Sequence, residues 1–236
     1  MRVGVLRTVV IIAICASSAG AQTLPLPQNL INLNSNQGSA LLHDSEALQS
    51  YWPLSIQFVT QKNQAFCGVA SIVMVLNALG IPAPTTPEFD PYKTFTQDNV
   101  FTPATEKLLP QETVHEMGMT LDQIGAFIGT YGVKAEVHHA SDSSIDKFRK
   151  LAQEYLNSPN HHVIVNYLRK SIGQEKGGHI SPLAAYDADT DRFLILDVAR
   201  YKYPPVWTAA AELFAAMSTT DSDNQNRTRG FVLISR

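Results

Sequence analysis

Cysteine is scarce in this chain of 236 residues, where Cys15 and Cys67 are the only two. Cys15 lies in an N-terminal apolar run that we expect to be removed, which leaves one thiol and no partner for an internal disulfide. A single unpaired thiol in an oxidising compartment is a liability unless it is buried or used. The scarcity of cysteine therefore directs attention to Cys67.

The chain also lacks an excess of basic charge and any long apolar run. Lys and Arg number 18 against 21 Asp and Glu, so the basic footprint typical of nucleic-acid binding is missing. The apolar run at residues 8–16 is too short to span a membrane comfortably. It follows Arg2 and Arg7 and precedes Ala19-Gly20-Ala21, which is the pattern of a secretory signal peptide.

We therefore expect residues 1–21 to be a signal peptide and residues 22–236 to form one catalytic domain exported to the periplasm. Cleavage after Ala21 removes Arg2, Arg7 and Cys15, and leaves 16 basic against 21 acidic residues. No membrane anchor is expected after cleavage. No linker divides the remaining 215 residues, which are enough to bury one core.

The most apolar stretch that remains predicts a buried central helix. From Val69 to Leu79 only Ser71 and Asn77 are polar, and a helix that is apolar on nearly all sides belongs in the middle of a domain. Gly80, followed by a proline at position 82, supplies the signal for its C-terminal end.

Cys67 lies at the first turn of this helix. Unpaired backbone N–H groups and the positive end of the helix dipole favour the thiolate there. The alternative is a small buried hydrophobe, which is the commoner role of a lone cysteine. Gln61, six residues upstream, carries a side-chain amide that could help hold an oxyanion, and this favours a nucleophilic Cys67.

The rest of the chain predicts an α+β fold, with helices first and a mostly antiparallel sheet after them. A short helical turn is expected around Leu41, and the proline-rich residues 82–110 are expected to form a packed loop and a wall of the substrate cleft. Capping and apolar periodicity predict further helices over 121–131, 145–156 and 209–217. Strands are expected over 133–137, 163–168, 179–186, 192–198 and 230–234.

Two of these strands flank a turn that is dense in aspartate, residues 187–191. Folding the hairpin about residue 188 puts position 179 opposite position 197, so that His179 and Asp197 become cross-strand neighbours. An aspartate at that separation can hold an imidazole in one tautomer and support its positive charge. Taken singly, each residue could equally be structural, His179 as a buried strand residue and Asp197 in a local turn.

The remaining histidines give no sign of a metal site. His138-His139 and His161-His162 are adjacent pairs, and neighbours along a strand point to opposite faces. His43 and His115 stand alone, so we predict no dedicated metal ligands.

Three segments together resemble the phytochelatin synthase family in its short bacterial form. They are Gln61 with Cys67-Gly68-Val69-Ala70-Ser71, then Gly177-Gly178-His179-Ile180-Ser181-Pro182, then the run from Asp197 to Pro205. The resemblance implies a papain-like cysteine protease fold and attack on the Cys-Gly bond of glutathione through a γ-Glu-Cys thioester. It implies Cys67 as nucleophile, His179 as base and then acid, Asp197 as its orienter, and Gln61 in the oxyanion hole.

The resemblance also implicates Arg229 in binding the α-carboxylate of the γ-Glu group, and Asp221 in binding its ammonium. No cofactor is expected, and heavy-metal ions such as Cd and Zn would enter as thiolate complexes of glutathione. Plant members carry a Cys-rich C-terminal extension that this sequence lacks, so we expect hydrolysis to dominate over transfer to a second glutathione. A homodimer stays open.

Two other functions stay open from the sequence. An exported papain-like peptidase, such as a bacteriocin-leader type, would use Cys, His and Asp alike on a longer peptide. A non-catalytic thiol-binding protein would not depend on His179 for turnover.

Overall fold

The computed structural model describes residues 23–236, and the expected signal peptide at residues 1–21 lies outside them. The helices are α1 (Asn36–Asp44), α2 (Tyr51–Ile56), α3 (Cys67–Ala78), α4 (Pro103–Leu108), α5 (Gln111–Met117), α6 (Leu121–Gly129), α7 (Ile145–Leu156) and α8 (Ala210–Met217). The strands are β1 (Ile31–Asn32), β2 (Lys134–His139), β3 (His161–Leu168), β4 (Gly178–Asp187), β5 (Arg192–Ile195), β6 (Val206–Ala209) and β7 (Gly230–Ser235). The α+β class is as expected from the sequence.

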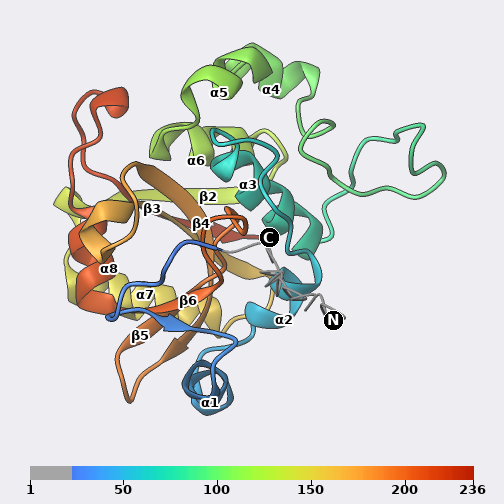
Figure 1. Cartoon of the computed structure of the whole chain (residues 1–236). Coiled ribbons are helices and arrows are strands. Elements are labelled where there is room, and N and C mark those ends of the chain that lie inside the picture. Colours follow the sequence, from blue (N-terminus) through green and yellow to red (C-terminus); the bar gives the residue numbers. More distant parts are fainter. Residues whose placement is uncertain (1–22) are drawn as a thin grey trace, which may run out of the picture.

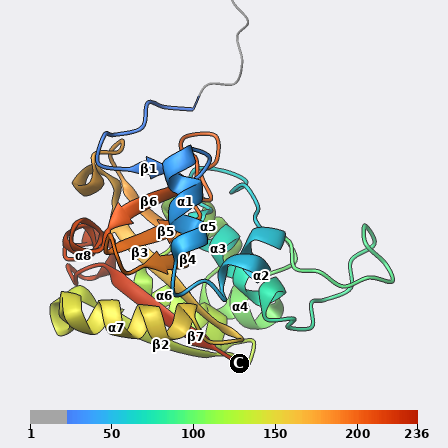
Figure 2. The same ribbon diagram turned by 90° about the horizontal axis from the view of Figure 1, so that it is seen from below.

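The strands form one sheet in the order β1-β6-β5-β4-β3-β7-β2, and every neighbouring pair is antiparallel. Helices α3 and α6 pack on one face, while α7 and α8 cover the other (Figures 1 and 2). No helix within residues 23–236 has the length and apolarity needed to span a membrane.

The central strands are buried on both faces because their side chains alternate between two cores. In β7, Val232 and Ile234 join the core around α3, while Phe231 and Leu233 join the core around α7 and α8. Continuous apolar runs are typical of strands covered on both sides. Helix α3 therefore packs on one face of a sheet whose other face is also buried.

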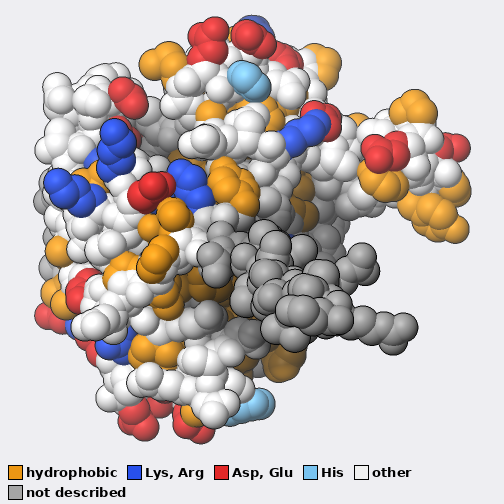
Figure 3. All heavy atoms as spheres, in the orientation of Figure 1, with side chains coloured by type: hydrophobic (Ala, Val, Ile, Leu, Met, Phe, Trp, Pro, Cys, Tyr) orange, Lys and Arg blue, Asp and Glu red, His pale blue; other side chains and the backbone are white. Residues whose placement is uncertain are grey.

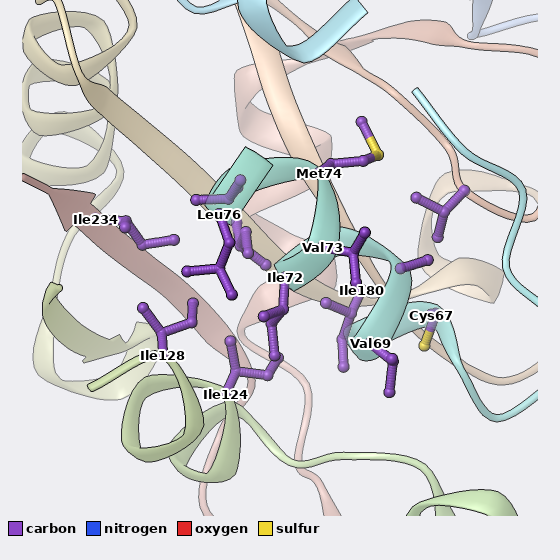
Figure 4. Close-up of a cluster of buried hydrophobic side chains, with 14 of the residues drawn as sticks. Cys67, Val69, Ile72, Val73, Met74, Leu76, Ile124, Ile128, Ile180 and Ile234 are labelled. Atoms are coloured by element: carbon purple, nitrogen blue, oxygen red, sulfur yellow. The ribbon is translucent and has the colours of Figure 1, made fainter. Parts of the chain in front are cut away.

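Helix α3 is the buried centre of the fold, with every residue from Cys67 to Leu76 buried (Figure 4). Its two polar side chains both form hydrogen bonds to other parts of the fold. Ser71 Oγ donates to the carbonyl of Ile180 on β4 at 3.3 Å, and Asn77 bonds both the N–H and the carbonyl of Phe95. The Ser71 bond ties the first half of α3 to the strand that carries His179, and the Asn77 bonds tie its C-terminal end to the segment that follows.

The C-terminal end of α3 follows the predicted stop signal. Gly80 has a φ of +62°, a left-handed conformation that glycine adopts without strain, and the N–H of Ile81 returns to the carbonyl of Leu76 at 3.0 Å. The guanidinium of Arg236 donates to the carbonyls of Leu79 and Gly80, beyond the last turn.

The segment after α3 differs from its expected role. Part of it projects from the body as an arm that carries hydrophobic side chains on its surface (Figures 1 and 3). Tyr92 is exposed, whereas Phe95 and Val100 are buried in the core around α3, so the prediction of a packed loop holds for the later part of the segment. No residue of 82–110 lines the cavity beside Cys67, so its assignment as a cleft wall is wrong. The wall on this side of the cavity is formed by α5 and by the residues that follow it. Helix α5 was not predicted from the sequence.

Gly230 shows how tightly β7 is held between its neighbours. A Cβ at this position would lie 2.0 Å from the carbonyl oxygen of His138 on β2, so any side chain must push the two strands apart. We expect Gly230→Ala to lower the free energy of unfolding by roughly 2–4 kcal/mol in a urea titration.

The matched control is Gly129→Ala, at the exposed end of α6. A Cβ there meets none of the described atoms within 4 Å, so alanine is expected to raise the free energy of unfolding by about 0.5–1 kcal/mol. Equal effects of the two substitutions would contradict the close approach of β2 to β7.

Candidate active site

Cys67 begins α3 at the boundary between the helical layer and the sheet (Figure 4). No side chain of residues 23–236 caps this helix, so its N-terminal N–H groups stay available to an anion. Burial opposes the charged thiolate. The hydrogen bond and charge of His179, with backbone bonds at Ile180 and Gly68, outweigh it and hold the pKa of Cys67 below its usual value.

His179 and Asp197 lie in direct contact, although not by the expected route. The turn is centred between residues 189 and 190 and not at residue 188, because Asp187 pairs with Arg192. The ladder then shifts between Leu183 and Ala185, and β5 ends at Ile195. That predicted register is wrong. The chain beyond β5 still runs beside β4, and Asp197 Oδ1 lies 2.9 Å from His179 Nε2, with both side chains buried.

The carboxylate fixes the orientation and charge of the imidazole. Burial disfavours imidazolium, but the charge of Asp197 outweighs it, and the pKa of His179 lies above its usual value. Asp197 and Ser181 Oγ both face Nε2, at 2.9 and 3.0 Å, so Nδ1 is the nitrogen left for the thiol. A sulfur, an imidazole and a carboxylate in this order can carry out nucleophilic acyl transfer.

Arg169 is a buried part of this group that sequence reasoning missed. Its guanidinium donates to both oxygens of Asp197, at 2.8 and 2.9 Å. Burial opposes the carboxylate charge, but His179 and then Arg169 outweigh it and hold the pKa of Asp197 far below its usual range. The sequence held one signal for this residue, namely the two expected strands 163–168 and 179–186. They pair in the structure with Tyr167 opposite His179. A hairpin about residue 173 brings Arg169 to the same end of the sheet.

Gln61 is buried, and its amide nitrogen already donates hydrogen bonds. Its Nε2 donates to the carbonyl of Asn63 at 2.6 Å and to the hydroxyl of Tyr201 at 3.1 Å, while its backbone N–H donates to Val198. An oxyanion would have to replace one of these acceptors. The role of Gln61 as an oxyanion donor stays a prediction.

A first cavity of about 200 Å³ opens beside Cys67 and His179. Its lining includes Asp221 and Arg229, which lie in the segment between α8 and β7. Arg229 donates to Asp221 Oδ1 at 3.3 Å, and its Nε has no hydrogen-bond partner within residues 23–236. Two opposite charges, one with a spare donor, thus face the space next to the thiol.

A second cavity of about 140 Å³ lies on another side of the same imidazole. It is lined by His179, Gln61 and Tyr201, together with the basic residues Lys176 and Lys202. The first and second cavities therefore share His179. Among the described residues there is no group of three or more His, Cys, Asp or Glu that could hold a metal ion.

The sequence matches the protein family described as phytochelatin synthase over residues 21–231. It is 38% identical over 216 residues to glutathione gamma-glutamylcysteinyltransferase 1 of Lotus japonicus, covering 90% of this chain and 42% of that protein. Identity is 36% over 218 residues to the Arabidopsis thaliana protein of the same name, covering 91% and 43%. The Schizosaccharomyces pombe glutathione gamma-glutamylcysteinyltransferase is 28% identical over 192 residues, covering 79% and 44%. The chain thus spans less than half the length of these relatives.

Proposed function

Because the chain belongs to the phytochelatin synthase family, we propose that it cleaves the Cys-Gly bond of glutathione through a thioester on Cys67. The γ-Glu-Cys group is then passed to water or to a second glutathione. The observation that carries this proposal is the thiol at the start of α3, bonded to an imidazole that Asp197 holds, beside a cavity with one charge of each sign.

In the first step the sulfur of Cys67 attacks the carbonyl carbon of the Cys-Gly peptide bond. The C–S bond forms as the C–N bond breaks, and the imidazolium of His179 gives its proton to the leaving amine of glycine. In the second step neutral His179 takes a proton from water or from the amine of a second glutathione. The water oxygen or the amine nitrogen attacks the carbonyl carbon of the thioester. The thiolate leaves, and the starting charge state returns.

Arg229 and Asp221 are proposed to bind the zwitterionic end of the γ-Glu group. In the ligand-free protein they pair with each other, and a substrate with one carboxylate and one ammonium would exchange partners with both. The spare Nε of Arg229 makes a second bond to the carboxylate available.

We expect Arg229→Gln to raise the KM for glutathione roughly 10- to 100-fold, because charge-assisted hydrogen bonds contribute about 1.5–3 kcal/mol. The kcat is expected to change little, since Arg229 is assigned to binding the γ-Glu end of the substrate and not to the bond that breaks. Steady-state glycine release measures both constants. Arg227→Gln, on the same loop but paired with Asp122 outside the first cavity, is the control, and an equal rise there would contradict the assignment.

Hydrolysis is proposed to dominate over transfer, and heavy metals to enter as thiolate complexes of the substrate. The basic residues of the second cavity, Lys176 and Lys202, support binding of an anionic acceptor there in the transfer reaction.

We place the activity in the periplasm, since residues 1–21 carry the signal-peptide pattern.

The test is incubation with glutathione, with and without cadmium, followed by quantification of glycine, γ-Glu-Cys and longer polymer. We expect glycine and γ-Glu-Cys in equal amounts, little polymer, and an intact mass raised by one γ-Glu-Cys group after acid quenching. Abundant polymer would overturn the proposed balance. Absence of glycine release would overturn the proposed function.

A further inference from the structure

Both terminal nitrogens of the Arg169 guanidinium form hydrogen bonds inside the protein. Beyond its two bonds to Asp197, it donates to Gln174 and lies over the ring of Tyr203, 5.2 Å from the centroid. The ring is held in turn, because the hydroxyl of Tyr203 accepts from the N–H of Glu175 at 2.8 Å. Only about 3% of Arg169 is exposed. Arg169 also reaches the lining of the second cavity, but its hydrogen bonds to Asp197 and Gln174 are made inside the protein.

Asp197 is consequently shared between two cations. Its Oδ1 accepts from His179, from Arg169 and from the backbone N–H of Ala199, at 2.9 Å in each case, while Oδ2 accepts only from Arg169. A carboxylate with a single cationic neighbour stabilises the positive charge of that neighbour. A second cation at the same distance repels the first and so offsets part of this stabilisation. Arg169 therefore opposes the charge that Asp197 favours on the imidazole.

We propose that Arg169 is a positioning residue that locks Asp197 in place and limits how strongly His179 holds its proton. The proposal rests on the proposed function, since a proton that must pass to a leaving amine and then be recovered needs a base of intermediate strength. A more basic imidazole would form the ion pair with the thiolate readily but would release its proton slowly to glycine.

Charged and titratable groups approach the imidazole from several elements. Cys67 approaches from α3, Tyr167 from β3 with its ring edge-on at 5.7 Å, and Asp197 from the chain after β5. Arg169, from the turn after β3, is the one cation that shares a hydrogen-bonded carboxylate with His179. The two lysines of the second cavity lie in more solvated positions, where their charges are screened.

The experiment is alkylation of Cys67 by iodoacetate across pH, in the absence of glutathione. The rate rises at a lower pH limit, where the thiolate–imidazolium pair forms, and falls at an upper pH limit, where the imidazolium that attracts the anionic reagent loses its proton. In Arg169→Gln, which keeps a hydrogen-bond donor but removes the charge, we expect the upper limit to rise by about one pH unit. The kcat for glycine release is expected to fall about tenfold with the KM within twofold of wild type.

Arg169→Lys is the matched control, because it retains the charge and is expected to keep the upper limit near that of wild type. If Arg169→Gln does not fold, Tyr203→Leu loosens the guanidinium while sparing Asp197, and a smaller rise in the same direction is expected. An unchanged or lowered upper limit in the neutral variant overturns the proposal, as does a raised KM with an unchanged alkylation profile. Since alkylation needs no substrate, a failure here is distinguishable from a failure of the proposed function.

Discussion

Replacing the sulfur by oxygen, in Cys67→Ser, is expected to reduce glycine release from glutathione by roughly 10⁴-fold or more. A serine hydroxyl at the start of α3 would not ionise near neutral pH, so the ion pair with His179 would not form and no thioester could accumulate. Steady-state glycine release and intact mass after acid quenching measure the two losses.

Binding is expected to survive this substitution because Arg229 and Asp221 are untouched. The dissociation constant of glutathione, measured by calorimetry, should stay within about threefold of the wild-type KM, and the thermal unfolding midpoint should change little. More than one hundredth of the wild-type turnover in Cys67→Ser would contradict a sulfur nucleophile and would favour an acid–base reaction that uses His179 alone.

The second large effect concerns the imidazole. In His179→Gln the thiol stays buried and keeps its backbone bonds at Ile180 and Gly68, but it loses the hydrogen bond and the charge of His179, so the pKa of Cys67 should rise toward its ordinary value of about 8.5. The sign follows from the structure, because removing the positive partner disfavours the thiolate. Only about 1% of the thiol would then be ionised at pH 6.5, and alkylation by iodoacetamide at that pH should fall by about 100-fold.

Turnover should fall further than alkylation, by roughly 10²- to 10⁴-fold, because the imidazole also gives a proton to the leaving glycine. His43→Gln, on the exposed end of α1, is the control and should leave both rates unchanged. Equal alkylation of wild type and His179→Gln at pH 6.5 would contradict the thiolate–imidazolium pair. Unchanged glycine release would point to a different base.

The helical half of the protein was largely predictable from the sequence because its signals are local. Apolar periodicity, a capping box at Thr120 and a stop at Gly80 placed α3, α6 and α7 within a few residues of their observed bounds. The short helices α2, α4 and α5 were missed, since one or two turns among prolines leave too few residues for a period to emerge.

The active site was harder because its geometry depends on strand register. The turn at 187–191 showed that β4 and β5 form a hairpin, but a shift between Leu183 and Ala185 depends on packing that no local pattern reveals. His179 and Asp197 were paired by a register that proved wrong, and they meet because their side chains reach across the irregular end of the ladder. Arg169 was missed for the complementary reason, since a single arginine after a strand looks like a solvated residue until its partners are known.

The position of β7 affects how the protein can be made. This strand is inserted between β3 and β2 rather than added at a sheet edge, so two open strand edges persist until residues 230–235 have paired with both. A fragment lacking only those six residues would keep every group around the sulfur. It would nevertheless lack the strand that joins β2 to the rest of the sheet, and completion of the fold around the site therefore waits for a segment that takes no part in its chemistry.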